Sequence, residues 1–230
     1  MAIELLDYPK AALRMVVATP YERDMRIRAC FKEPATVRWI ETFQEGDVFY
    51  DIGANVGSYS LVAAQQGAKV FAFEPEAMNY GRLVQNVGLN EETPGKVFPL
   101  CAAIWDKWEV LDLHMRASVP GAASHRFEPN VHDKYAHQPA VSMILDDLPN
   151  YDIPLANHIK IDVDGYEERV LNGAYFALIS PQLKSVMCEM QHSDEGAYQR
   201  CRERLEDAGL REVDVVEQSG TGANRFWVRD

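Results

Sequence analysis

A short loop in the first half of the chain has residue types and spacing that suit a small charged ligand. Residues 51–57 read Asp-Ile-Gly-Ala-Asn-Val-Gly, with an apolar run before them and a helical pattern after them. Asparagine tolerates positive φ angles, so Gly53, Asn55 and Gly57 predict a tight turn that ends at a helix N-terminus, where backbone N–H groups meet a ligand. No lysine follows, as a nucleoside triphosphate loop requires, and the dinucleotide spacing G-x-G-x-x-G is absent.

Two acidic residues beside this loop indicate which ligand fits. Asp51 ends the apolar run, where a carboxylate repels a pyrophosphate but suits an ammonium group or a hydroxyl. Glu74 ends the next apolar run, where its oxygens can accept hydrogen bonds from ribose hydroxyls. The pair favours S-adenosylmethionine, which carries an ammonium and a sulfonium group, although Glu74 alone also fits an NAD-dependent enzyme. The alternative without a ligand is that both acids cap helices.

A second pair of acids lies in the segment HIKIDVDGYEERVL. Asp162 and Asp164 are two residues apart, so both face one pocket if strand geometry persists through Asp164. Two neighbouring acids raise one another's pKa, which makes one of them a candidate proton acceptor. The structural alternative is that Asp164 caps a helix that begins near Tyr166.

The histidines of the chain allow either a base or a metal ligand. His125 belongs to an irregular stretch, residues 116–140, which is predicted to form a lid and to supply a histidine base. Glu189 and His192 end a later strand beside Asp162 and Asp164, so the four side chains allow a Mg²⁺ or Mn²⁺ site. Because no tight ligand motif is present, we expect a reaction that is independent of metal.

The elements that must position these residues alternate between strand and helix patterns from residue 48 onward, which predicts a parallel α/β sheet. Residues 1–45 are interpreted as an N-terminal cap packed on the core, and residues 46–230 as a cofactor-binding domain, in a single domain overall. Strands are predicted at 48–52, 69–73, 97–102, 110–115, 158–163, 185–190, 210–216 and 226–228. Helices are predicted at 58–66, 77–89, 167–177 and 197–208, and the cap is expected to contain a strand near 13–19 and a helix at 35–43.

Composition narrows the class of protein. The 230 residues carry a net charge of −12, so a polyanion such as nucleic acid is repelled by the average field. No run of about 18 apolar residues is present, and acids interrupt the first apolar run, so neither a membrane span nor a signal peptide is expected. Four scattered cysteines are typical of reduced thiols, and we expect a cytoplasmic protein. The sequence does not indicate an oligomeric state.

Four segments together resemble one known family. DIGANVGSYS, FAFEPEAMNYGRLVQN, SMILDDL and IKIDVDGYEERVLNGA are similar to the FkbM-type methyltransferases, which use S-adenosylmethionine. The resemblance covers about residues 46–190, and Asp164 stands where the family usually has Glu. It implies a Rossmann-like, seven-stranded class I methyltransferase sheet with helices on both faces and the last strand antiparallel. Known members are mainly O-methyltransferases that act on sugars, polyketides and similar metabolites.

The resemblance also implies a set of cofactor-binding residues. Residues of the first loop line the amino acid end of the cofactor, Glu74 holds the ribose, and residues 102–104 lie by the adenine. The full set is Asp51, Gly53, Asn55, Gly57, Ser58, Glu74, Ala103, Ile104 and Asp162. The candidate catalytic residues are Asp162, Asp164 and His125. The sequence therefore predicts an O-methyltransferase that acts on a hydroxyl-bearing small molecule, with an NAD-dependent oxidoreductase or an inactive cofactor-binding subunit as the alternatives.

Overall fold

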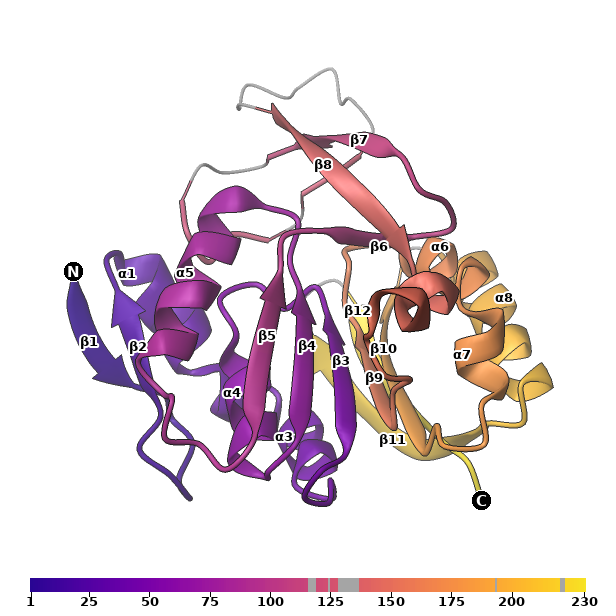
Figure 1. Cartoon of the computed structure of the whole chain (residues 1–230), viewed down its shortest axis with the longest axis horizontal. Coiled ribbons are helices and arrows are strands. Elements are labelled where there is room, and N and C mark those ends of the chain that lie inside the picture. Colours follow the sequence, from indigo (N-terminus) through magenta and orange to yellow (C-terminus); the bar gives the residue numbers. More distant parts are fainter. Residues whose placement is uncertain (116–118, 124, 128–136, 193, 220–221) are drawn as a thin grey trace.

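The computed structural model has a seven-stranded sheet at its centre with helices on both faces (Figure 1). It describes residues 1–115, 119–123, 125–127, 137–192, 194–219 and 222–230. The strands lie in the order β11, β12, β10, β9, β3, β4 and β5. Their bounds, in that order, are Arg211–Ser219, Gly222–Val228, Ser185–Gln191, His158–Ile161, Val48–Ile52, Lys69–Phe73 and Lys96–Leu100.

The direction of the strands confirms the fold class expected from the sequence. Strands β10, β9, β3, β4 and β5 pair in parallel, whereas β12 pairs antiparallel with both β10 and β11. Parallel strands leave their carboxyl ends at one edge of the sheet, where ligands bind in open α/β folds. Residues 53–55, 74–75 and 162–164 follow three adjacent strands at this edge.

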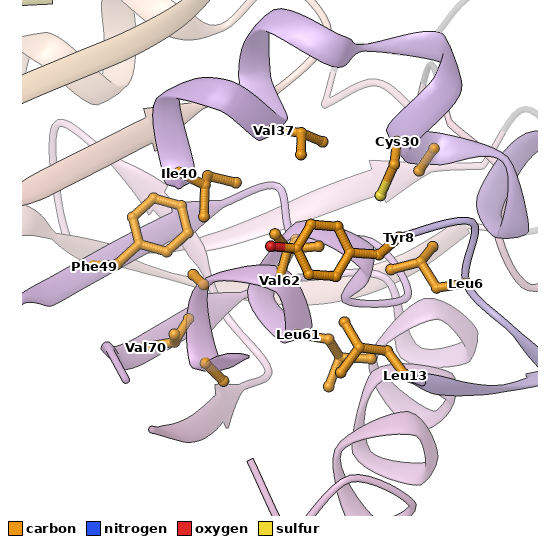
Figure 2. Close-up of a cluster of buried hydrophobic side chains, with 14 of the residues drawn as sticks. Leu6, Tyr8, Leu13, Cys30, Val37, Ile40, Phe49, Leu61, Val62 and Val70 are labelled. Atoms are coloured by element: carbon orange, nitrogen blue, oxygen red, sulfur yellow. The ribbon is translucent and has the colours of Figure 1, made fainter. Parts of the chain in front are cut away.

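Two buried clusters, one on each face of the sheet, fix the register of the strands. Neighbouring residues of β3 point to opposite faces, so Phe49 joins one cluster while Tyr50 joins the other. The first cluster lies under α3 (Pro34–Ile40), α4 (Ser58–Gln65) and α5 (Ala77–Gly88). Figure 2 shows part of it, with side chains of α3 facing Val62 and Phe49. The second cluster lies under η2 (Leu145–Tyr151), α6 (Glu167–Asn172), α7 (Tyr175–Ile179) and α8 (Glu195–Asp207).

The N-terminal residues pack along the first of these faces, beside α5 (Figure 1). They form β1 (Ala2–Leu5), β2 (Arg14–Val17), α1 (Pro20–Glu22), the π-helix η1 (Arg23–Ile27) and α2 (Ala29–Lys32) before α3. The predicted strand near 13–19 and helix at 35–43 correspond to β2 and α3. A buried ion pair of 2.9 Å between Arg82 and Glu22 joins α5 to α1. The cap boundary at residue 45 stays a prediction.

A small three-stranded sheet lies above the carboxyl edge of the main sheet (Figure 1). Its strands are β6 (Ala103–Trp105), β8 (His137–Ile144) and β7 (Val110–His114), with β8 in the middle. The prediction of an irregular segment through residue 140 is therefore wrong at its end, because β8 begins at His137. Most of the predicted lid, residues 116–118, 124 and 128–136, lies outside the described residues.

Two other predicted elements need correction. The predicted strand at 158–163 ends at Ile161, and the predicted helix at 167–177 is divided into α6 and α7. Gly173 separates these helices, and a Cβ atom there would lie 2.3 Å from the carbonyl oxygen of Trp105, so the chain passes too close to continue one regular helix. Within the described residues, no helix has both the length and the apolar character that a bilayer crossing requires.

Candidate active site

A cavity opens at the carboxyl edge of β3, β4 and β9, with about 1010 Å³ of empty space including its mouth. Nine of the predicted site residues line it: Gly53, Asn55, Ser58, Glu74, Ala103, Ile104, His125, Asp162 and Asp164. Asp51 and Gly57 do not line the cavity; they contact Ser60 and Leu83 on the protein side of the loop. The fold thus gathers residues from five separate stretches of sequence into one site, at the edge where open α/β sheets bind ligands.

The loop after β3 has the backbone that its sequence predicts. Gly53, Asn55 and Gly57 all have positive φ angles, of 78°, 51° and 89°. A Cβ atom on Gly53 would lie 1.9 Å from the carbonyl oxygen of Asp162, so only glycine allows β3 and β9 to approach so closely. A Cβ atom on Gly57 would lie 2.5 Å from Leu83, so this glycine lets α5 pack against the loop.

Glu74 lies buried at the end of β4 and accepts two backbone hydrogen bonds. The N–H groups of Asn55 and Glu76 donate to its two carboxylate oxygens at 2.8 and 2.9 Å. Burial raises the pKa of Glu74 to about 7, although these two bonds oppose the rise. Each oxygen keeps a second lone pair, so the carboxylate can still accept bonds from a ligand in the cavity.

A buried lysine joins the acids at the ends of β3 and β9, and the sequence analysis overlooked it. Lys160 lies with its Nζ 2.8 Å from Oδ2 of Asp162 and 3.6 Å from Oδ1 of Asp51. Burial opposes the charge of Lys160, but the two carboxylates outweigh it and raise its pKa. Burial raises the pKa of Asp51, while Lys160 and a 2.5 Å hydrogen bond from Ser60 counteract part of that rise.

Asp162 and Asp164 both line the cavity, as expected, but not through the strand geometry that their spacing suggested. Strand β9 ends before both of them, and Asp164 has a left-handed φ angle of 56°, so the two-residue alternation of a strand does not apply. Burial would raise the pKa of Asp162, but Lys160 holds it below its ordinary value. The N-cap position of α6 is Tyr166 rather than Asp164.

We call Gly53, Asn55, Glu74 and Asp162 the strand wall of the cavity, because they follow its three parallel strands. We call Arg26, Glu33, Ala122 and His125 the outer wall, because these lining residues come from the N-terminal region and from residues 122–125 rather than from the strand ends. Arg26 comes from the π-helix η1, a rare element that is frequent at functional sites. Glu33 is a buried carboxyl group whose pKa is raised by burial and by Asp162. Neither residue was predicted, since no local motif marks it.

His125 lines the cavity together with the two other candidate catalytic residues, Asp162 and Asp164. Its ring is half-buried, and burial lowers its pKa from 6.5, with Arg26 adding to the effect and Glu76 opposing it. A histidine in this state is neutral at pH 7 and can accept a proton.

The segment of residues 119–123 lies across the cavity and is held by side chains from both walls. The carbonyl of Ala122 accepts hydrogen bonds from the side-chain amides of Asn55 and Asn79, at 2.7 and 3.1 Å. The N–H of Gly121 donates to Oδ1 of Asn79, and its carbonyl accepts from Nε of Arg26. We refer to residues 119–123 as the strap, because these four bonds fasten it over the loop after β3.

Comparison with known proteins identifies the family. Residues 51–212 match the model of the methyltransferase FkbM domain, which is more than half of the chain. The chain belongs to the FkbM methyltransferase family. A curated relative is the hexuronic acid methyltransferase AglP of Haloferax volcanii, which is 31% identical over 162 residues. That match covers 69% of this chain and 63% of AglP, so the chain spans less than two thirds of the relative's length.

Solved structures agree with the fold of this family. The FkbM methyltransferase of Methylobacillus flagellatus superimposes with a TM-score of 0.57 at 13% identity, over 92% of this chain and 48% of its own. Magnesium protoporphyrin IX methyltransferase of Synechocystis, solved with bound S-adenosylmethionine, gives a TM-score of 0.56 at 14% identity, over 94% of this chain and 86% of its own. At such low identity these likenesses establish the class I fold alone. Family membership favours the methyltransferase prediction over the NAD-dependent oxidoreductase.

The four candidate metal ligands from the sequence were Asp162, Asp164, Glu189 and His192. Among the described residues, no group of three or more His, Cys, Asp or Glu side chains is placed to hold a metal ion. Asp162, one of the four side chains considered, is instead bonded to Lys160. One oxygen of its carboxylate therefore already accepts a hydrogen bond from an ammonium group of the protein itself.

Proposed function

We propose that the protein transfers the methyl group of S-adenosylmethionine to a hydroxyl group of a small metabolite. The observation that carries this proposal is the single cavity that joins Glu74, Asp162 and His125 around the loop after β3. A carboxylate suited to ribose hydroxyls, an ionised acid suited to an ammonium group and a neutral base face the same space.

The chemistry of the strand wall fits the cofactor. Each carboxylate oxygen of Glu74 has a lone pair that does not bond to a backbone N–H group. These lone pairs would accept hydrogen bonds from the ribose hydroxyls. Asp162 would accept a bond from the ammonium group, and Ala103 and Ile104 would give an apolar surface to the adenine. Bound S-adenosylmethionine supplies a methyl group that its positive sulfur has already activated.

Other residues of the predicted set would shape the cofactor site rather than touch the cofactor. Asp51 faces Ser60 and Lys160, and Gly57 makes room for Leu83. The hydroxyl of Ser58, at the start of α4, donates to the carbonyl of Arg26 at 3.1 Å. These contacts support the loop from the side of the protein.

We propose His125 as the residue that accepts the proton of the acceptor hydroxyl. It lines the same cavity as the acids of the strand wall, and its lowered pKa leaves the ring neutral at pH 7. Asp162 is a weaker candidate, because a carboxylate bonded to Lys160 and held in its charged form is a poor base. Asp164 lines the same cavity and would orient the acceptor.

A sugar acid is the first acceptor class to test. The relative AglP is a hexuronic acid methyltransferase, and Arg26 and Lys32 at this cavity provide positive charge for a carboxylate. The net charge of −12 makes such local cations important, since the average field repels anions.

A binding titration followed by a transfer assay tests the proposal. Calorimetry should give micromolar affinity for S-adenosylhomocysteine and no measurable affinity for NAD. Methyl transfer from labelled S-adenosylmethionine should then appear with glucuronic acid glycosides and disappear with acceptors whose hydroxyls are blocked. Tight NAD binding would favour the oxidoreductase, while S-adenosylhomocysteine binding without transfer to any hydroxyl acceptor would favour the inactive cofactor-binding subunit.

A further inference from the structure

Lys160 is a charged residue in the middle of a fully buried strand. Its side chain is 1% exposed, and both of its neighbours in β9, Ile159 and Ile161, are completely buried. Its Nζ contacts Asp162 and Asp51 and lies 5.6 Å from the centre of the Tyr59 ring. Removing an ammonium group from water costs several kcal/mol, and an apolar side chain of similar volume often stabilises a core as well or better. Stability alone therefore gives a poor explanation for a lysine here.

The contacts of Asp162 suggest what the lysine does. Lys160 donates to Oδ2 of Asp162, and Glu189 makes a further side-chain hydrogen bond with this carboxyl group. The Asp162 side chain still lines the cavity and is 30% exposed. The titratable and charged groups around it come from several elements: Asp51, Tyr59, Lys160, Glu33, Arg26, Glu167, Cys188 and Glu189. Burial and the nearby acids favour a protonated Asp162, and Lys160 is the closest cation opposing them.

We propose that Lys160 is a positioning residue that keeps Asp162 charged and aimed into the cavity, so that Asp162 binds the ammonium group at the amino acid end of the cofactor. This inference rests on the proposed function, since S-adenosylmethionine and S-adenosylhomocysteine both carry that ammonium group. Lys160 itself lies behind Asp162 and need not touch the cofactor.

The experiment compares two ligands that differ in the amino acid end. S-adenosylhomocysteine carries the ammonium group, whereas 5′-methylthioadenosine keeps the adenosine part and lacks that end. In Lys160→Met, affinity for S-adenosylhomocysteine should fall about 10- to 100-fold, because a charge-assisted hydrogen bond is weakened. Affinity for methylthioadenosine should change by less than about twofold. Lys184→Met is the matched control, since Lys184 pairs with Asp47 at 2.6 Å, and it should leave both affinities unchanged.

A pH series distinguishes positioning of a charge from simple loss of packing. The ratio of the two affinities cancels the titration of Glu74, which both ligands share through the ribose. In the wild-type protein this ratio should stay constant from pH 5.5 to 8. In Lys160→Met it should decline as pH falls, because Asp162 then becomes protonated within this range.

The outcomes separate this inference from the proposed function. If the wild-type protein binds neither ligand, the proposed function fails. If it binds both, and Lys160→Met weakens neither or weakens both equally, the function stands and the role of Lys160 is overturned. Asp162→Asn gives the same decision if Lys160→Met does not fold. Asp162→Asn must lose affinity for S-adenosylhomocysteine but not for methylthioadenosine, and this loss must not depend on pH. An unchanged ratio of the two affinities would overturn the inference.

Discussion

The two walls of the cavity are built in different ways. The strand wall uses residues that directly follow parallel strands, and each lies within a few residues of a recognisable motif. The outer wall brings together the N-terminal helices and the strap, and Arg26 bonds to a residue 95 positions away. The first wall is fixed by the backbone hydrogen bonds of the sheet, whereas the second depends on a few side-chain contacts. We therefore expect changes in the strand wall to abolish cofactor binding, and changes in the outer wall to affect the acceptor and the rate.

Gly53→Ala is expected to have the largest effect, because it acts on the backbone of the strand wall. The new methyl group would overlap the carbonyl oxygen of Asp162, at a φ angle of 78° that L-residues adopt at a cost. Overpacking and the left-handed backbone together should lower the free energy of unfolding by about 2–5 kcal/mol. Calorimetry should detect no S-adenosylhomocysteine binding.

Gly46→Ala is the control for Gly53→Ala. Gly46 has a similar φ angle of 85°, and a Cβ atom there would meet nothing within 4 Å. It should lose only about 1–2 kcal/mol for the backbone conformation and should bind the ligand normally. Normal binding by Gly53→Ala would show that the approach of β3 to β9 is not needed for the site.

His125→Asn tests the outer wall at the step of proton transfer. Removal of a general base should lower kcat by about 10²–10⁴ while the Kd of S-adenosylhomocysteine changes little. Because the pKa of His125 is lowered from 6.5, the wild-type rate should fall only at pH values below 6.5, where the ring gains a proton. Steady-state kinetics between pH 5 and 8 measures both effects, and the acid limb should be absent from the variant.

His137→Asn is the matched change away from the cavity. His137 is exposed on β8, where it contacts Asp112 at 2.7 Å. Its loss should leave kcat close to that of the wild-type protein. An equal loss of rate in both variants, or none in His125→Asn, would remove His125 from the mechanism.

Glu74→Gln tests the strand wall through the pH dependence of protein stability. The pKa of Glu74 in the folded protein is about 7, above its ordinary value of 4.5. Between pH 4.5 and pH 7 the carboxyl group is therefore protonated in the folded state and ionised in the unfolded state. Stability from this group is present below pH 4.5 and lost as pH rises to 7, by at most about 3 kcal/mol. The variant stays neutral, so its unliganded form should gain stability relative to the wild-type protein above pH 7.

The affinity for S-adenosylhomocysteine has the opposite pH dependence, because ribose hydroxyls need the charged form of Glu74. It should increase in the wild-type protein as pH rises through about 7 and lose this dependence in Glu74→Gln. Glu167 is the control, since burial also raises its pKa to about 7, while its carboxylate bonds to backbone N–H groups of residues 163 and 165. Glu167→Gln should change the pH dependence of stability but not that of binding, and equal binding curves would contradict the ribose role.

The difference between the strand wall and the outer wall also explains which features could be predicted from the sequence. The bounds of β3 and β4 match the prediction, and Asn55 has the positive φ angle expected of it, because short-range patterns determine both. The predicted strand at 158–163 was two residues too long, because the end of a strand depends on the partner strand as well as on its own sequence. Lys160 could have been recognised, since a lysine inside an apolar strand needs a buried acid, and Asp162 stands two residues later.

The outer wall could not be predicted for a physical reason. Arg26 and Glu33 reach the cavity only because the N-terminal helices pack on the sheet. That packing is fixed by contacts such as the hydrogen bond from Asn224 to Glu33, across 191 residues. No window of sequence contains both partners of such a contact. Composition and periodicity predicted the helix at 35–43, but neither the short helices between residues 20 and 32 nor the side chains that reach the cavity.

Asn79→Ala is expected to have the smallest effect, and it tests whether the strap serves the acceptor. The side chain of Asn79 donates to the carbonyl of Ala122 and accepts from the N–H of Gly121. Loss of both bonds should lower the free energy of unfolding by about 1–3 kcal/mol. A looser strap should raise the KM of the acceptor several-fold, while kcat changes less than in His125→Asn.

Asn90→Ala isolates this effect from general destabilisation. Asn90 is on the same side of the sheet as Asn79, is similarly buried, and makes two bonds to the backbone of Arg14 in β2 rather than to the strap. It should lower stability by a similar amount and leave the acceptor KM unchanged. If the two variants raise KM equally, the outer wall responds to stability alone, and the division between a cofactor wall and an acceptor wall loses its support.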